Sequence, residues 1–199
     1  MDDSIFNPNG KQSTSSKITV GLERISEAFK VLLWEKAKLV GLSPIQIQIL
    51  IFTAYHQQNL CNVSHLAKEF NVTKPTISDA VRVLLQKELI IKKIASNDSR
   101  RYSIVLSGHG HKMVRDTENF AAPLHTQLES IETNDLENLF KTLAKLIYKL
   151  NRSGILTVQR TCYGCKFYAH KDNNDFCNLL NKPLKSEEIQ LDCPEFKEV

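Results

Sequence analysis

Apolar side chains recur at helical spacings over the first part of the chain. Between residues 17 and 40 they alternate at spacings of four and three, which predicts one long amphipathic helix. These positions are Ile18, Leu22, Ile25, Phe29, Leu32 and Leu39, with Lys36 filling one place among them. Gly41 ends this helix, and Ser43-Pro44 starts a second helix that runs to about Gln57. Residues 45–52 alternate locally like a strand, but the Ser-Pro opening favours a helix.

A compact run of short elements follows over residues 62–107. The pattern predicts, in order, a helix (62–70), a turn (71–73), a helix (74–88), a strand (89–95), a polar and charged loop (96–101) and a strand (102–107). This is the order of a winged helix-turn-helix, a module that reads DNA. The sequence therefore predicts a mainly α fold of the α+β class built around this module.

The second helix of the module separates apolar from polar side chains. Thr73 is a suitable N-cap, and Pro75 lies in the first turn, where its missing N–H costs little. The predicted buried stripe consists of Ile77, Val81, Leu84 and Leu85. The opposite face carries Thr76, Ser78, Asp79, Arg82 and Gln86. Such side chains reach base edges and phosphates from a helix in the major groove, although an ordinary amphipathic helix also has a solvated face.

Two further helical stripes follow the second strand. The first consists of Met113, Phe120, Leu124, Leu128 and Ile131. The second begins at the cap Thr133-Asn-Asp135 and consists of Leu136, Leu139, Phe140, Leu143, Ile147 and Leu150. A compact winged helix has no room to bury three stripes of this length. These helices therefore pack against one another or intertwine with those of a second subunit.

Composition and charge support a DNA partner. Apolar residues make up 42% of the 199 residues, which is enough to build a core. Residues 62–115 contain ten Lys and Arg against four Asp and Glu, whereas the remainder contains sixteen against eighteen. The excess positive charge is thus confined to the winged module, where binding of basic side chains to phosphates would release counterions from DNA. No apolar run reaches the length of a membrane span, and the start lacks the features of an export signal, so we expect a cytoplasmic protein with no membrane partner.

The wing resembles that of a known family. The stretch from Asp98 to Gly110 reads Asp-x-Arg, five residues, Leu-Ser, two residues, Gly, and it resembles the wing signature of the MarR family of bacterial transcription regulators. The one departure is Ser107, where the family has Thr. Upstream, Leu42-Ser43-Pro44-Ile45-Gln46 resembles the family's Leu-Thr-x-x-Gln opening of the second helix. Lys87-Glu88-Leu89 departs from the usual Lys-Gly-Leu, so the preceding helix is expected to end differently.

The resemblance covers roughly residues 20–150 and implies a function. It implies a homodimer with interlocked terminal helices, two recognition helices about one DNA turn apart on an inverted repeat, and a small aromatic effector. On this interpretation Thr76, Ser78 and Arg82 contact the major groove of double-stranded DNA, and Lys74 contacts phosphate. Arg100 and Arg101 reach the minor groove or the backbone from the wing, and Asp98 positions those arginines.

Residues 155–199 lie beyond the family pattern and are rich in cysteine. Cys162 and Cys165 form a Cys-x-x-Cys, Cys177 follows after eleven residues, and Cys193 follows after fifteen more, directly before Pro194. A reduced cytosolic chain rarely concentrates thiols in this way, and the segment has few apolar residues with which to fold alone. We therefore predict a metal site formed by these four cysteines. Cys61 stands apart and is interpreted as a partly buried structural residue.

The metal itself is less constrained by the sequence. Tetrahedral zinc is the commonest use of four thiolates in a small loop-rich module, and we favour it. A single Cys-x-x-Cys with two isolated cysteines, the last followed by Pro, also suits a 4Fe–4S cluster, which stays as the alternative. His170 lies in a polar stretch and is interpreted as solvated.

These patterns predict a tail (1–16), a MarR-like domain with dimerisation helices (17–154) and a metal-binding appendage (155–199). The leading hypothesis is a sequence-specific DNA-binding transcription regulator, modulated by a small ligand or by the cysteine site. The alternative hypotheses are a thiol or iron–sulfur redox protein and a protein-interaction module that kept the winged fold. An enzyme is disfavoured, because the chain has no phosphate-binding Gly loop, no His-Glu-x-x-His and no Gly-x-Ser-x-Gly.

Overall fold

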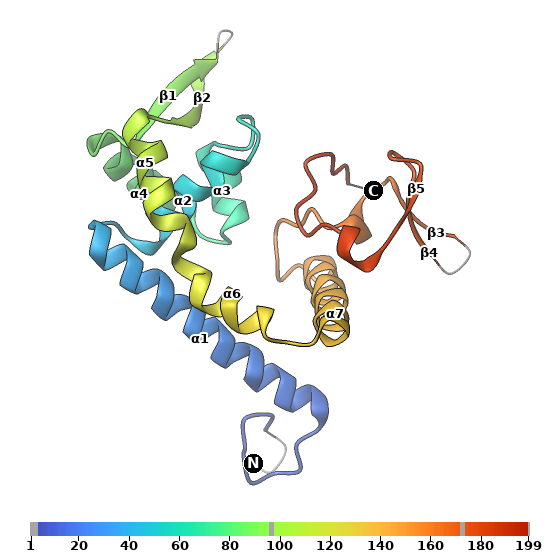
Figure 1. Cartoon of the computed structure of the whole chain (residues 1–199). Helices are drawn as coiled ribbons and strands as arrows, with labels where there is room; N and C mark the ends of the chain where they lie inside the picture. The colour runs from blue at the N-terminus through green and yellow to red at the C-terminus, as the bar shows by residue number, and fades with distance from the viewer. Residues whose placement is uncertain (1–3, 96–97, 172–173, 199) are drawn as a thin grey trace.

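The computed structural model describes residues 4–95, 98–171 and 174–198, and the side chains of residues 95–101 are outside the described part (Figure 1). The winged module and the long first helix lie on one side of the molecule, and the segment from α7 to the C-terminus lies on the other. No single helix in the described ranges is long and apolar enough to cross a membrane. Helices α1 and α2 pass that test only as a pair joined by a 91° bend.

The N-terminal half consists of four helices and a two-stranded wing. Their bounds are α1 Thr14–Val40, α2 Pro44–Tyr55, α3 Val63–Glu69, α4 Lys74–Gln86, β1 Ile90–Ala95 and β2 Asp98–Leu106. Helix α1 begins three residues earlier than predicted, because Ser13 accepts a hydrogen bond from the backbone N–H of Ser16 as its N-cap. It ends at Gly41, whose φ of 65° is easily adopted by glycine.

The assignment of α2 as a helix is confirmed. Ser43 and Gln46 form a capping box: the Gln46 side chain accepts a hydrogen bond from the Ser43 N–H at 2.9 Å. Both Ile47 and Ile49 are fully buried, which explains why the segment looked like a strand. Helix α2 is buried or half-buried at every position except Tyr55. Its apolar residues therefore do not follow a single helical face.

The buried core lies between α2, α3, α4 and the base of the wing. Its fully buried members include Ile47, Leu50, Leu66, Ile77, Leu84 and Ile104. The strands pair antiparallel, with Ile90 opposite Leu106 and Ile94 opposite Tyr102. The backbone N–H of Ile104 donates to the Cys61 carbonyl at 2.7 Å, which joins the wing to the α2–α3 connection. Strand β2 starts at Asp98, inside the predicted loop, so the paired part of the wing is longer than expected.

The helix predicted over residues 113–131 is broken into pieces. The structure divides this stretch into α5 Gly108–Thr117, a 3-10 turn η1 Glu118–Ala121 and α6 Ala122–Glu129. Pro123 lies in the first turn of α6, where it suits a new helix start but cannot continue an existing hydrogen-bond ladder. Gly110, the last residue of the wing signature, is buried in α5. A Cβ atom there would clash with the backbone oxygen of Leu89.

The C-terminal part contains one long helix and a small sheet. Its elements are α7 Thr133–Arg152, η2 Cys162–Gly164, β3 Tyr168–Lys171, β4 Asn174–Cys177, β5 Lys182–Leu184 and η3 Ser186–Glu188. The three strands form an antiparallel sheet in the order β3-β4-β5. Helix α7 contacts η2 and η3, and Ala144 is its one residue classed as buried.

Candidate nucleic-acid interface and four-cysteine site

Helix α4 presents the predicted polar face to solvent. The hydroxyl of Thr73 caps the helix and accepts a hydrogen bond from the Thr76 N–H at 3.4 Å. Ile77, Val81 and Leu84 are buried, as the stripe predicted, whereas Leu85 is only half-buried and Ala80 is an additional buried member. Because these residues fix the rotation of the helix about its axis, the remaining faces point away from the core.

Each predicted contact residue on α4 is exposed. Lys74, Thr76, Ser78 and Arg82 are all accessible to solvent on one surface of the module. The Arg82 side chain is 64% exposed and donates a hydrogen bond to Asp79 at 2.9 Å, one turn away. An exposed pair of this kind contributes little to stability, so Arg82 is free to exchange Asp79 for another acceptor.

The wing brings further positive charge next to this helix. Arg100 and Arg101 belong to β2, but their side chains, like that of Asp98, lie outside the described residues. On the paired strand, Lys92 lies over the Tyr102 ring at 4.6 Å, and Lys93 is exposed. The sequence predicted no DNA contact for these two lysines, although both contribute to the excess positive charge of the winged module. Adjacent residues of a strand point to opposite faces, so the two lysines place charge on both sides of the wing.

Cys61 has the structural role expected of it. Its side chain is 1% exposed and its thiol donates to the backbone oxygen of Gln57 at 3.5 Å. Burial raises the pKa of this thiol, which disfavours the reactive thiolate.

The other four cysteines are brought together by the backbone of the appendage. The turn η2 places Cys162 and Cys165 side by side, with the Cys165 N–H donating to the Cys162 carbonyl at 3.0 Å. Cys193 lies next to them because its N–H donates to the Arg160 carbonyl at 3.1 Å. Cys177 is opposite Tyr168 in the β3–β4 ladder, and the Tyr168 N–H donates to the Cys165 carbonyl at 2.9 Å.

The environment of these thiols is partly apolar. All four are free and buried or half-buried. Burial raises the pKa of the Cys162 thiol, although a hydrogen bond from the Gln190 N–H partly offsets the effect. The thiol of Cys162 interacts electrostatically with those of the other three cysteines. However, no group of three or more His, Cys, Asp or Glu side chains among the described residues is arranged to hold a metal ion.

His170 is exposed, as predicted, and its Nδ1 lies 3.2 Å from the Asp175 carboxylate. Asp175 also accepts a hydrogen bond from the Tyr168 hydroxyl at 2.6 Å. Burial would raise the pKa of Asp175, but the hydrogen bonds from Tyr168 and His170 outweigh it and lower this pKa. This histidine is therefore part of a polar contact within the β3–β4 hairpin.

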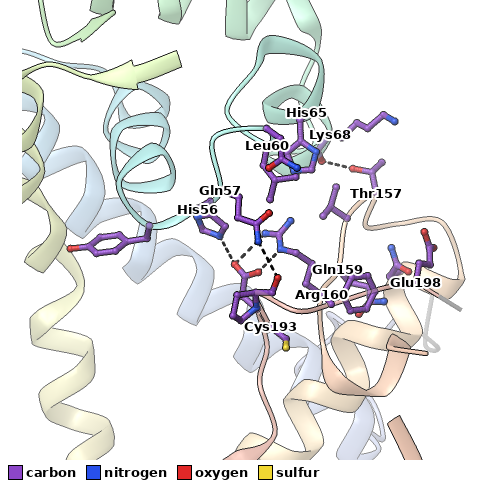
Figure 2. Close-up of a pocket in the computed structure, with 17 residues that line it drawn as sticks. His56, Gln57, Leu60, His65, Lys68, Thr157, Gln159, Arg160, Cys193 and Glu198 are labelled. Carbon is purple, nitrogen blue, oxygen red and sulfur yellow. Dashed lines mark hydrogen bonds and ion pairs between the residues drawn. The ribbon is translucent and has the colours of Figure 1, made fainter. Parts of the chain in front are cut away.

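A charged cluster that the sequence did not reveal joins the appendage to the winged module, and Figure 2 shows two of its members, Arg160 and His56. Arg160 donates two hydrogen bonds to Glu69, at 2.8 and 2.9 Å, and others to Asp192. His56 Nε2 lies 2.5 Å from the same Asp192 carboxylate. The Arg160 guanidinium also lies 5.7 Å from the centre of the Phe52 ring. No local sequence signal could have paired Arg160 with Glu69, which lies in a distant segment of the chain.

The electrostatics of this cluster favour the charged forms of Arg160 and Asp192. Burial lowers the pKa of Arg160, but its hydrogen bonds to Asp192 and Glu69 outweigh that effect and raise the pKa above its ordinary value. Burial would raise the pKa of Asp192, but Arg160 and His56 lower it. A planar guanidinium bonded to two carboxylates is the geometry in which arginine pairs most strongly.

A cleft of about 680 Å³ lies at the same junction. It is lined on one side by residues between α2 and α3, including Gln57 and Lys68, and on the other by residues of the appendage. Two further bonds cross the junction: the Thr157 hydroxyl donates to the Lys68 carbonyl, and the Gln57 amide donates to the Pro194 carbonyl at 3.3 Å. The appendage is thus docked directly on the winged module.

The order of elements, the buried stripe of α4 and the paired basic wing define a winged helix-turn-helix protein. Comparisons with known proteins agree. Residues 40–101 match the model of the MarR family. The structure of S. aureus MepR in complex with DNA is similar with a TM-score of 0.58 at 26% identity, covering 66% of this chain and 97% of that one. Over this winged module the chain is thus similar to the MarR family.

Two more solved structures are similar. A MepR point mutant from a multidrug-resistant S. aureus clinical isolate has a TM-score of 0.53 at 26% identity and covers 67% of this chain and 96% of its own. The transcriptional regulator PA3341 has a TM-score of 0.59 at 22% identity, with 68% of this chain and 98% of its own covered, which supports the fold alone. No significant match was found among curated proteins.

Proposed function

We propose that this protein is a sequence-specific DNA-binding transcription regulator that acts as a homodimer on an inverted-repeat operator. The observation that carries the proposal is the exposed polar face of α4 beside the lysine- and arginine-bearing wing. A helix with this composition fits the major groove, while wing arginines suit the minor groove or the backbone. The similarity to MepR, which has been solved in complex with DNA, supports a DNA partner.

The dimer follows from apolar surface that a single chain leaves in water. Ile18, Ile25 and Leu39 of the predicted α1 stripe are 56%, 53% and 81% exposed. An exposed apolar stripe along one helix is typical of an interface with another subunit. In this proposal α1 of one protomer packs against its partner, which sets the spacing of the two α4 helices.

Two arginine variants test the DNA interface. Arg101→Ala should weaken binding to every duplex and reduce the slope of log affinity against log salt by about 1. Arg82→Ala should cost about 1–3 kcal/mol on the preferred operator and also relax sequence preference. Affinities would be measured by gel shift at two salt concentrations, on an operator selected from random duplexes.

Arg152→Ala provides the matched control, since Arg152 is exposed at the end of α7, away from the wing. It should leave both affinity and salt dependence unchanged. The proposal would be overturned if no operator is selected, or if neither Arg82→Ala nor Arg101→Ala weakens binding.

Regulation has two proposed inputs. A small aromatic effector is implied by the family resemblance, and we propose that such a ligand shifts the affinity for DNA. The second input is a metal or metal cluster at Cys162, Cys165, Cys177 and Cys193. Four free, half-buried or buried thiols in one small sheet-and-turn unit support this second proposal.

A further inference from the structure

We propose that the described part of the appendage, residues 155–198, positions the winged module for DNA, and that Arg160 is its principal positioning residue. The appendage packs on α7 and also holds the C-terminal end of α3, so it fixes the orientation of the winged module relative to α7. The inference rests on the proposed homodimeric DNA-binding function. It adds what determines the half-site spacing that the dimer accepts.

The path of the chain from the winged module to α7 is interrupted. After the wing the chain forms α5, the turn η1 and α6 over residues 108–129, before α7 begins at Thr133. Pro123, in the first turn of α6, cannot continue the hydrogen-bond ladder of a preceding helix. A continuous helix acts as a stiff spacer, whereas short helical pieces joined by turns do not. The orientation of the module relative to α7 therefore depends on further contacts.

The appendage is fixed to α7 both along the helix and at its end. The turns η2 and η3 pack against the helix. At its end, the N–H groups of Ile155 and Leu156 donate to the Leu150 carbonyl at 3.0 and 3.3 Å. The Asn151 side chain donates to the Leu156 carbonyl at 2.9 Å. The Leu150 carbonyl is one of those that the last turn of a helix leaves without an intrahelical partner, so these bonds join the appendage to the end of α7.

The appendage also binds the end of α3 and the turn that follows it. The Thr157 hydroxyl donates to the Lys68 carbonyl in the last turn of α3. The Asn71 side chain donates to the Ile155 carbonyl at 3.5 Å. Asn71 has a φ of 53° and belongs to the turn between α3 and α4, two residues before the N-cap Thr73. The appendage therefore contacts the helix-turn-helix directly before the predicted recognition helix.

Arg160 makes the most directional of these contacts. Its guanidinium donates to both carboxylate oxygens of Glu69, at 2.8 and 2.9 Å, and the two side chains are only 12% and 18% exposed. Such a two-bond pair fixes direction as well as distance. In Figure 2 the Arg160 side chain points from the appendage toward residues of the winged module.

A second contact holds the end of α2. A parallel β-bridge joins Arg160 to Asp192, whose carboxylate lies 2.5 Å from His56 Nε2, directly after α2. Helices α2 and α3 both pack against α4. The appendage thus holds the two helices that support the predicted recognition helix, while none of its contacts involves the exposed polar face of α4.

This arrangement bears on how a dimer binds DNA. Two recognition helices can occupy one inverted repeat only if their separation and relative rotation match those of the half-sites. Each base pair added between the half-sites rotates one of them by about a tenth of a turn, so a dimer with fixed modules prefers one spacing. Without the Arg160–Glu69 contact each module turns more freely about the interrupted α5–η1–α6 segment. The dimer then loses part of the advantage of binding both half-sites together and accepts more spacings.

Hydrogen exchange of the full-length protein tests the docking without DNA. Arg160→Gln should speed exchange at residues 63–71 and 155–161 by at least about five-fold, because a buried carboxylate loses its partner. Amides of β1 and β2 should keep their protection, which would show that the module remains folded. Arg152→Gln is the matched control, since Arg152 is exposed at the end of α7, and it should behave like the unmodified protein.

Thr157→Val is a milder variant for the same measurement. It removes one hydrogen bond across the junction without changing a charge. Exchange at residues 63–71 should increase by a smaller factor than in Arg160→Gln. Unchanged exchange at these residues in both variants would overturn the inference.

Gel shifts on a series of inverted repeats test the role in recognition. The duplexes carry the selected half-sites at separations changed by one base pair at a time, and a duplex with a single half-site is the reference. The unmodified protein should bind the best separation at least about ten-fold more tightly than one changed by half a turn. Arg160→Gln should reduce this ratio by at least about five-fold, while its affinity for the single half-site changes by less than about two-fold.

Two further comparisons separate positioning from a loss of stability. Glu69→Gln should reduce the ratio as Arg160→Gln does, and the double variant should reduce it no further, because both changes remove the same contact. Arg160→Lys keeps the charge but not the two-bond geometry, so its ratio should lie between those of Arg160→Gln and the unmodified protein. Arg152→Gln should leave the ratio unchanged.

The outcomes distinguish this inference from the proposed function. An unchanged ratio in Arg160→Gln overturns the inference, and so does an equal loss of affinity for single and paired half-sites, because the contact would then only stabilise the module. Protein that binds no duplex refutes the proposed function and with it the role in spacing. Exchange at α3 that depends on Arg160 would still support the docking in that case.

Discussion

Glu88 adopts a backbone conformation that suits glycine better. Its φ is 56°, in the left-handed region, at the position where the MarR pattern has glycine. The chain has to reverse here because α4 ends at Gln86 and β1 begins at Ile90. For a residue with a side chain this conformation costs about 1–2 kcal/mol. The Ser107 hydroxyl donates to the Glu88 carbonyl at 2.6 Å and helps to fix the turn.

We therefore expect Glu88→Gly to stabilise the protein. The relief of left-handed strain exceeds the extra unfolded-state entropy of glycine, and the net gain should be about 0.5–1 kcal/mol. Urea unfolding would measure it as a higher midpoint at an unchanged slope. Glu88→Ala is the control, since alanine keeps the Cβ atom and the strain. An equal gain from both variants would show that the side chain, not the backbone, limits stability.

Whether the place of a site residue could be predicted depended on how far along the chain its contact partners lie. The exposed face of α4 could be predicted because Ile77, Val81 and Leu84 alone fix its rotation. The contact between Arg160 and Glu69 could not, because it joins two charged residues that lie in unrelated segments. The side chains of Arg100 and Arg101 lie outside the described residues, so their role stays a prediction.

At the level of elements, the sequence predicted a helix correctly where an N-cap residue precedes a clear helical period of apolar residues. The N-caps Ser43 and Thr73 both precede the helices they were expected to start, whereas α7 is capped by Glu132 and not by the predicted Thr133-Asn-Asp135. The predicted helix over residues 113–131 failed because its stripe of apolar residues continued across Pro123 without a change of period. A hydrophobic pattern shows which face of a helix is apolar. It does not show where the backbone hydrogen bonds of the helix are interrupted, because the same spacing of apolar residues can continue across the break.

Helix α7 packs against the appendage and has one buried residue. Ala144 is fully buried, and the neighbours of α7 are η2 and η3 of the appendage. Nearby, the Lys145 ammonium lies 5.9 Å from the centre of the Tyr163 ring, beside Cys162. Because Ala144 is the buried residue of α7, we expect this small side chain to lie at the contact between α7 and the appendage.

Ala144→Leu should loosen the appendage. Three additional heavy atoms at a closely packed contact cost about 1–3 kcal/mol, and this cost falls on the docking of η2 and η3. Hydrogen exchange should increase over residues 155–198 while the winged core stays protected. Asn138→Leu, at an exposed position of the same helix, is the matched control and should leave exchange unchanged. If residues 155–198 are equally protected from exchange in both variants, α7 contacts the appendage through a residue other than Ala144.

At the scale of the whole molecule, α1 leaves many of its apolar side chains exposed to solvent within one chain. Its residues 23–31 are all exposed, and its two buried residues, Leu33 and Ala37, lie near its C-terminal end. In Figure 1 the N-terminal half of α1 extends away from the winged module. Phe29 contacts Phe120 of η1 at 5.0 Å, but Ile25, one turn earlier, is 53% exposed. A second α1, or the partner's terminal helices, would cover this surface.

Ile25→Lys should therefore separate the proposed dimer. A lysine at the centre of an apolar interface loses hydration without gaining a partner, which costs several kcal/mol across two symmetric copies. Sedimentation velocity should show a monomer at micromolar concentration, and affinity for the full inverted repeat should fall to that for one half-site, because the two recognition helices are no longer linked. Glu23→Lys places the same charge on the opposite face of α1 and should remain dimeric. A dimer that survives Ile25→Lys with full operator affinity would mean that the subunits meet through another surface, and the spacing of the two α4 helices would then have to be set by α7 or the appendage.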